Sequence, residues 1–239
     1  MLDKNKNLPN HIAIIPDGNR RWAKKHKLEA WIGHKKGAEY IEKLADVLIE
    51  MNIPYLSFWG SSKDNLQKRP KEEVAFLLQL FKEKFLELSE SEKVTKNEMK
   101  INIIGDWRAQ FPEDVKKALN QAIENTKNYN KFSLNFFLAY SGTEEMIDVA
   151  KCIIEKSKKN SSLEINKDLI KSCLSTSALP AVDLVIRTGG EPHLSDGFMM
   201  WETANSQLYF SDKLYPDFNK NDFRNAIENY TQRERRFGK

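Results

Sequence analysis

Short apolar runs alternate with segments of helical periodicity along almost the whole chain. The runs have the length of buried strands, and the segments between them repeat their apolar residues every three or four positions. Such alternation favours a mainly parallel sheet with helices on both faces. The runs that we predict as strands are Ile12–Ile15, Tyr55–Gly60, Ile101–Ile104, Phe132–Ala139, Val182–Ile186 and Gln207–Phe210. We therefore expect an α/β fold with a central, mainly parallel six-stranded sheet flanked by helices.

The segments between these runs predict the helices and the loops. Two polar stretches, Ser61–Pro70 and Glu90–Lys100, lack an apolar stripe, and we expect them to be loops. The predicted helices are Arg20–His26, a longer one over 38–49, Lys71–Ser89, Pro112–Thr126, Thr143–Ser157, one that ends at Leu174, and Asp222–Tyr230. A chain of 239 residues, 40% of them hydrophobic, is long enough for one good core. We therefore predict a single domain over residues 1–239, in which residues 1–10 form a flexible N-terminus.

The composition argues against several classes of protein. No apolar run approaches the roughly 20 residues of a membrane-spanning helix, and the N-terminus lacks the apolar core of a signal peptide. We therefore expect a cytoplasmic protein. Cys152 and Cys173 fit no metal or redox spacing, so we expect two free thiols in a reducing compartment. The net charge of +4 permits nucleic-acid binding, but no motif supports it, and we predict no nucleic-acid partner.

The stretch His11–Lys24, HIAIIPDGNRRWAK, carries the strongest local signal. Its order of residue types predicts a strand, a turn and the start of a helix, and a helix start attracts anions. Arg20 and Arg21 can each bind phosphate oxygens through two N–H groups. Asp17 places a carboxylate beside these cations, which makes chemical sense if Mg²⁺ bridges it to a diphosphate. The alternative is a simple Asp17-Gly18 turn with solvated arginines.

Ligands of parallel α/β sheets bind beyond the carboxyl ends of the strands. This rule brings four loops together, namely Asp17–Trp22, Ser61–Arg69, Ser141-Gly142 and Arg187–Ser195. The last of these leaves a buried strand with an arginine followed by two glycines, which indicates close approach of the backbone to a ligand. Apolar residues of the neighbouring helix and strand would form a wall below this rim. A polar rim above an apolar wall suits a long apolar diphosphate, although most of those side chains are equally well explained as core.

Several motifs together resemble the cis-prenyltransferase family, of the undecaprenyl diphosphate synthase type. They are HIAIIPDGNRRWAK, SSKDN followed by KRPKEEV, DLVIRTGGEP, LYPDF and RERRFG, and they extend from His11 to Gly238. The resemblance implies the cis-prenyltransferase fold and a homodimer. It also implies an enzyme that condenses isopentenyl diphosphate with an allylic diphosphate and makes each new double bond cis.

The resemblance assigns roles to particular residues. Asp17 and Asn65 would be catalytic, and Asp17 would bind Mg²⁺ together with a weaker contribution from Gln207. The residues implied in substrate binding are Gly18, Asn19, Arg20, Arg21, Trp22, His34, Ser61, Ser62, Asp64, Arg69, Arg187, His193, Ser195 and Arg236. Because long prenyl products are insoluble in water, we also expect peripheral membrane contact during product release.

This sequence departs from the family pattern at several positions. Ala30 and His193 stand where phosphate-binding arginines are usual, and Gln207 stands where a glutamate linked to metal is usual. We expect weaker metal or substrate affinity as a result. Bulky residues also stand where long-chain members often carry smaller ones, and they predict a narrow tunnel with a short or medium product. These residues are Trp59, Phe137 and Leu138.

Other functions fit parts of the sequence. A non-catalytic partner subunit of the same fold typically keeps the C-terminal arginine motif and loses the aspartate, whereas this chain has both Arg236 and Asp17. A hydrolase that uses Asp17 as its nucleophile would want a second acid at position 19, where this chain has Asn19. A branching prenyl synthase of the same fold, which joins two short units head to middle, stays open at this point.

Overall fold

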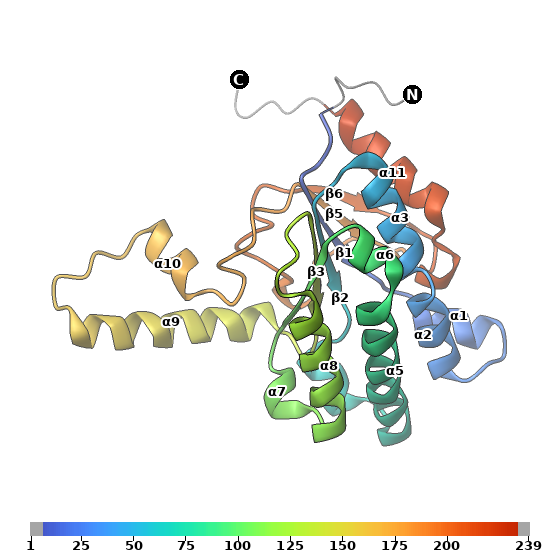
Figure 1. Cartoon of the computed structure of the whole chain (residues 1–239), viewed down its shortest axis with the longest axis horizontal. Helices are drawn as coiled ribbons and strands as arrows, with labels where there is room; N and C mark the ends of the chain where they lie inside the picture. Colours follow the sequence, from blue (N-terminus) through green and yellow to red (C-terminus); the bar gives the residue numbers. More distant parts are fainter. Residues whose placement is uncertain (1–6, 234–239) are drawn as a thin grey trace.

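The computed structural model describes residues 7–233, and it has the predicted α/β fold. Six strands, all parallel, form one sheet in the order β3-β4-β2-β1-β5-β6 (Figure 1). The strands are β1 (His11–Ile15), β2 (Tyr55–Trp59), β3 (Met99–Ile104), β4 (Phe132–Phe137), β5 (Leu184–Arg187) and β6 (Gln207–Phe210). Each predicted strand is confirmed, with ends that differ by no more than two residues.

The predicted helices are also present; the longer one over 38–49 is α3, and α2, which ends at Ala38, was not predicted. The helices are α1 (Asn19–Lys25), α2 (Ala30–Ala38), α3 (Ile41–Met51), α4 (Lys63–Lys68), α5 (Lys71–Glu90), α6 (Glu92–Lys96), α7 (Trp107–Gln110), α8 (Glu113–Thr126), α9 (Gly142–Lys159), α10 (Lys167–Cys173) and α11 (Lys220–Gln232). Two short 3₁₀ turns cover Ser195–Gly197 and Tyr215–Asp217. No helix within residues 7–233 is long and apolar enough to cross a membrane.

Both stretches that we expected to be loops contain a short helix instead. Ser62 caps α4 by accepting a hydrogen bond from the backbone N–H of Asn65, and Ser91 caps α6 in the same way from Lys93. Such side-chain caps stabilise a helix start by about 1 kcal/mol. Helices of five or six residues show no apolar stripe, so periodicity alone misses them.

The sheet separates two apolar cores because successive side chains of a strand point to opposite faces. On one face, Ile12, Ile14, Phe58 and Phe136 pack with residues from α3, α5, α8 and α11. On the other face, Ala13, Ile15, Trp59 and Phe137 pack with Phe198 and Met199 from the chain after β5. The carboxyl ends of β1, β2 and β5 lie between the two cores. The loops that follow these strands form the site described below.

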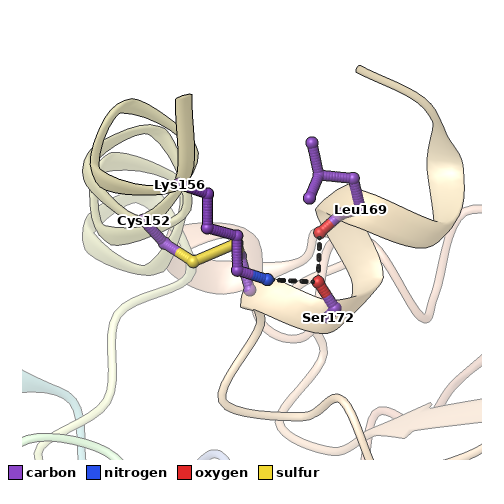
Figure 2. The surroundings of a disulfide bond; sticks show 5 residues. Cys152, Lys156, Leu169 and Ser172 are labelled. Atoms are coloured by element: carbon purple, nitrogen blue, oxygen red, sulfur yellow. Dashed lines mark hydrogen bonds between the residues drawn. A yellow bond between two sulfur atoms is a disulfide. The ribbon is translucent and has the colours of Figure 1, made fainter. Parts of the chain in front are cut away.

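Helix α9 extends away from the sheet, and α10 lies beside it (Figure 1). A disulfide joins Cys152 of α9 to Cys173 of α10, so the expectation of two free thiols is wrong (Figure 2). The helix pair brings the two Cα atoms to 5.9 Å, although the cysteines are 21 residues apart in the sequence. Beside the disulfide, Lys156 Nζ donates a hydrogen bond of 2.8 Å to Ser172 Oγ.

The start of the described chain already contacts the body of the molecule. Leu8 packs against the larger core, and the backbone N–H of Asn10 donates to Asp183 Oδ2 at 2.8 Å. The expectation of a flexible N-terminus is therefore wrong for residues 8–10, and residues 1–6 lie outside the described residues. Arg236 also lies outside them.

Candidate active site

A cleft of about 500 Å³ lies at the carboxyl ends of β1, β2 and β5. It gathers most of the residues that the sequence predicts for the site. The predicted residues that line it are Asp17, Gly18, Asn19, Arg20, Arg21, His34, Ser61, Ser62, Asp64, Asn65, Arg69, Arg187 and Ser195. Loops that are up to 178 positions apart in the sequence thus form one polar rim, as the rule for parallel sheets predicts.

Three predicted residues do not line this cleft. Trp22 Nε1 donates a hydrogen bond of 2.8 Å to Asp217, and the Trp22 ring packs against His26. His193 is 57% exposed, and its backbone oxygen, rather than its ring, serves the site by accepting from Arg187 at 2.8 Å. Gln207 begins β6 opposite Leu184, three residues and thus about 10 Å before the end of the strand.

The backbone holds Asp17 firmly at the centre of the cleft. Its carbonyl oxygen accepts hydrogen bonds from Thr188 Oγ1 at 2.8 Å and from the backbone N–H of Tyr215 at 3.0 Å. The next residue, Gly18, has a φ of 107°, and an added Cβ would lie 2.8 Å from Leu214. Glycine is therefore required there on both conformational and steric grounds. The Asp17 carboxylate contacts Arg21 at 3.2 Å and Arg187 at 2.8 Å.

Arg187, the last residue of β5, is a buried cation on one side of the cleft. Its Nη1 donates to Ser195 Oγ and to the His193 carbonyl, and its Nη2 contacts Asp17 and, at 3.4 Å, Glu191. Its Nε–H is buried and has no protein partner. Gly189 has a φ of 92°, and an added Cβ would lie 2.6 Å from the Arg21 guanidinium. The glycine therefore lets Arg21 come close to the same side of the cleft.

A second cationic group surrounds Glu73, which is buried in the first turn of α5. Its carboxylate lies 3.6 Å from Arg20, 3.3 Å from His34 and 3.3 Å from Arg69. The hydrogen bond with His34 and the nearby arginine charges lower the pKa of Glu73, so it stays ionised. Burial lowers the pKa of His34 despite the adjacent carboxylate, so its ring is neutral at pH 7. Arg69 Nε is buried and, like Arg187 Nε, has no protein partner.

Sequence reasoning missed three acidic residues of this site. Glu73 contacts the cations directly, and its spacing of four residues from Arg69 at a helix start was an available signal. Glu191 and Asp196 line the cleft from the loop after β5. Glu191 contacts Arg21 and Arg187, and Asp196 accepts a hydrogen bond from Thr143 Oγ1. Nothing local in the sequence distinguishes either of them from an ordinary loop acid.

A mostly apolar cavity of about 90 Å³ adjoins the cleft. The two share four lining residues, Pro16, Asn19, His34 and Gly60, so the polar and apolar spaces meet there. The apolar side chains of this cavity come from β2, β4, the residue after β4, α5 and the turn after β6. They include Phe58, Leu77, Leu80, Phe81, Phe85, Leu88, Phe136, Leu138 and Tyr215.

The expected narrowing of this cavity by three bulky residues holds only for Leu138. Trp59 and Phe137 belong to the core on the opposite face of the sheet, where both pack against Phe198. Their strand neighbours Phe58 and Phe136 line the apolar cavity instead. The prediction failed because the side-chain alternation of a strand cannot be assigned to a face before the packing of both faces is known.

A family model described as putative undecaprenyl diphosphate synthase matches residues 15–238. The chain belongs to this family. A tritrans,polycis-undecaprenyl-diphosphate synthase (geranylgeranyl-diphosphate specific) of Methanocaldococcus jannaschii is 41% identical over 242 residues, which cover 100% of this chain and 85% of that protein. An isoprenyl transferase of Thermotoga maritima is 39% identical over 231 residues, 97% of each chain. Because the chain belongs to the undecaprenyl diphosphate synthase family, it is a cis-prenyltransferase.

Solved structures agree with this family assignment. Lavandulyl diphosphate synthase from Lavandula x intermedia, in complex with dimethylallyl diphosphate, superposes with a TM-score of 0.89 at 30% identity. The match covers 97% of this chain and 99% of that one. The expected cis-prenyltransferase fold is therefore confirmed.

Prenyltransferases of this kind generally use Mg²⁺, and the cleft offers a suitable donor. Within residues 7–233 no group of three or more His, Cys, Asp or Glu side chains is arranged to hold a metal ion. Mg²⁺ is commonly bound by one or two carboxylates together with substrate phosphates, and the partly exposed Asp17 carboxylate fits that mode. Gln207 begins its strand at the opposite end from Arg187, so this chain does not bring it to Asp17.

Proposed function

We propose that the enzyme condenses isopentenyl diphosphate with an allylic diphosphate, in the presence of Mg²⁺, to form a cis-polyprenyl diphosphate. The observation that carries the proposal is the junction of the polar cleft with the apolar cavity at Asn19 and His34. An allylic diphosphate has a charged head and an apolar tail on one molecule. A site for it needs both kinds of surface, in contact with each other.

The group around Glu73 is suited to the allylic diphosphate. His34 belongs both to this group and to the mouth of the apolar cavity, so a diphosphate bound there would direct its chain into that cavity. Arg69 offers a buried Nε–H to a phosphate oxygen. Arg20, which is more exposed, adds a second guanidinium, and arginines bind phosphate oxygens in pairs. Each buried CH₂ of the chain would add about 0.8 kcal/mol.

The opposite group suits the second diphosphate, that of isopentenyl diphosphate. Arg187, Arg21 and Ser195 lie together there, and Arg187 Nε is free to donate. Asp17 lies within reach of both groups, because it contacts Arg21 and Arg187 directly and its charge also acts on Arg69. Two anchored diphosphates would hold the two reacting carbons close together, which is a large part of the rate acceleration in a bimolecular reaction.

The reaction breaks the allylic C–O bond, and the electron pair leaves with the diphosphate. The alkene of isopentenyl diphosphate supplies the pair for the new C–C bond, and the neighbouring carbon loses a proton to form the new double bond. Mg²⁺ held by Asp17 would supply positive charge to the leaving group. Arg20 and Arg69 stabilise the same charge. Asn65, which lines the cleft, would hold the departing diphosphate so that one of its oxygens takes the proton.

We propose a long product rather than the short or medium one expected from Trp59 and Phe137. Those two side chains do not line the apolar cavity, and the relatives are named for undecaprenyl products. Because a cavity of about 90 Å³ is too small for a long chain, α5 would have to move away from α2 and α3 as the chain grows. The relatives' names also make geranylgeranyl diphosphate the first primer to test. Release of such a product would involve peripheral contact with a membrane.

We further propose that each chain is a single domain, since all six strands belong to one sheet. We also propose that two chains form a homodimer, because apolar side chains are exposed on two elements. Ile147 and Ile154 lie seven residues apart on the projecting helix α9 and are 52% and 54% exposed. Leu208 and Phe210 of the edge strand β6 are also exposed. Exposed apolar stripes of this kind mark protein interfaces. Replacing Ile147 and Ile154 by lysine should convert the dimer to a monomer in light scattering, and an unchanged mass would contradict this interface.

The test of the proposed reaction is a turnover assay with mass-spectrometric sizing of products. Labelled isopentenyl diphosphate and Mg²⁺ would be supplied with dimethylallyl, geranyl, farnesyl or geranylgeranyl diphosphate in turn. We expect a ladder of products spaced by C5 units, lost in Asp17→Asn and kept in Asp168→Asn on the surface of α10. A single product from dimethylallyl diphosphate alone would instead support the branching reaction, and no product with any primer would refute the proposal.

A further inference from the structure

A second cavity, of about 470 Å³, lies along the edge strand β3 and shares no lining residue with the cleft. Its walls come from β2, β3, β4, the start of α7, the end of α8 and the segment 175–179. The lining residues that bear on a ligand are Tyr55, Lys100, Arg108, Tyr129, Asn130 and Lys131. Its size lies within the range of small-molecule sites.

The charge of this cavity is one-sided. Lys100, Arg108 and Lys131 line it, and no aspartate or glutamate does. Within the described part of the chain, none of the three cations forms an ion pair with a carboxylate, whereas Arg21, Arg69 and Arg187 in the active-site cleft all do. Three like charges that face one space favour an anion there.

The cations are held in place by their surroundings. The Arg108 guanidinium lies 4.0 Å from the ring centroid of the buried Trp107, and Lys131 Nζ lies 5.8 Å from that of Phe132. Contacts of this kind stabilise a cation over an aromatic face while leaving its outward N–H groups free for a ligand. Lys100 projects from β3 directly beside Ser133 of β4.

The wall beneath the cations is a hydrogen-bonded row of polar side chains across the sheet. Asn102 Nδ2 donates to Ser133 Oγ at 3.0 Å and to Asn135 Oδ1 at 2.9 Å. Asn135 in turn donates to Ser57, whose hydroxyl is bonded to His11. Polar residues on this part of the sheet contrast with the apolar Ile15, Trp59 and Phe137 at the carboxyl end of the same face. The part of the sheet face that carries this polar row therefore suits a polar ligand better than an apolar one.

We propose that this cavity binds a small phosphorylated molecule. Three cations without carboxylate partners favour a polyvalent anion, and a guanidinium binds two phosphate oxygens at once. The tyrosines Tyr55 and Tyr129 and the amide of Asn130 add neutral hydrogen-bonding groups around the charged centre. The site is separate from the substrate cleft, so a phosphate compound bound here leaves the two diphosphate anchors free.

The experiment counts binding sites for labelled inorganic diphosphate on the full-length protein by equilibrium dialysis. The wild type should bind three molecules, one on each of the two diphosphate anchors of the cleft and one in the cavity. The triple variant K100M/R108M/K131M should lose the cavity site, with at least tenfold weaker binding there. A matched triple variant, K117M/K151M/K158M, removes the same charge from exposed residues of α8 and α9 and should keep all three sites. Arg187→Met should weaken only the cleft anchor that contains Arg187.

Further measurements keep the result interpretable. Arg108→Lys keeps the positive charge and changes only an exposed side chain. It should weaken diphosphate binding in the cavity and leave the Tm unchanged. Citrate at equal concentration should displace diphosphate less well than a sugar phosphate does. Absence of any site in the wild type beyond the two anchors of the cleft, or equal losses in the two triple variants, would overturn the proposal. The turnover assay tests the proposed reaction in the cleft, and the dialysis experiment tests binding in the cavity. Failure of one proposal is therefore distinguishable from failure of the other.

Discussion

Glu73 gives the sharpest test of how the cleft is held together. It is a buried carboxylate among Arg20, His34 and Arg69, on the first turn of α5. The substitution Glu73→Gln keeps the size of the side chain and one oxygen acceptor but removes the charge. Arg69, itself largely buried, then lacks its counterion.

The magnitude follows from the burial of this pair. Removing one partner of a buried ion pair costs about 3 to 5 kcal/mol. The lower end applies here, because glutamine can still accept one hydrogen bond and the Arg20 side chain is 58% exposed. We therefore expect the free energy of unfolding to fall by about 3 kcal/mol. For a chain of this length that corresponds to a decrease in Tm of about 6 to 12 °C.

The assay is thermal unfolding with and without inorganic diphosphate. Glu72→Gln is the matched control, since it makes the same change on the same helix turn at an exposed side chain. We expect Glu72→Gln to shift the Tm by less than about 2 °C, as is usual for surface substitutions. Diphosphate should raise the Tm of Glu73→Gln more than that of the wild type, because it restores negative charge beside Arg69. Equal Tm values in the two variants, or equal stabilisation of all three proteins, would refute this reasoning.

Three further predictions concern the tunnel, the buried histidine and the disulfide. Phe58→Ala should lengthen the products seen by mass spectrometry and its strand neighbour Trp59→Ala should not, since only Phe58 lines the apolar cavity; the opposite pattern would contradict the assigned faces. Burial lowers the pKa of His11 to about 4, so the unfolded state binds its proton first as the pH falls. Urea unfolding should therefore show about 2 kcal/mol less stability at pH 5 than at pH 7, and His11→Asn should reduce that difference. Cys152→Ser should lower the free energy of unfolding by about 3 kcal/mol, from the loop closed by the disulfide, and a reductant should then have no further effect.

The sequence predicts the sheet well because its strands carry a strong and simple signal. Ile12–Ile15 is a continuous apolar run and Phe132–Ala139 a nearly continuous one, which is what strands buried on both faces require. The carboxyl-end rule then brings Asp17, Arg69 and Arg187 into one cleft without any knowledge of distances. Those parts of the site depend only on strand order and direction.

What the sequence did not reveal depends on side-chain direction and on contacts between distant segments. Trp59 and Phe58 are adjacent, and only the packing of Phe198 shows which of them faces the second core. Glu73 and Glu72 are equally adjacent, and only the position of His34 shows which one turns inward. The pairing of Cys152 with Cys173 requires that α10 lie beside α9, which no spacing motif encodes.

The most direct test of the central claim is a crystal structure of the enzyme with a non-hydrolysable allylic thiodiphosphate and Mn²⁺ in place of Mg²⁺. The account predicts the diphosphate on Arg20, His34 and Arg69, the anomalous signal of the ion beside Asp17, and the prenyl chain between α2, α3 and α5. A prenyl chain outside the apolar cavity, or an ion with no Asp17 contact, would contradict it.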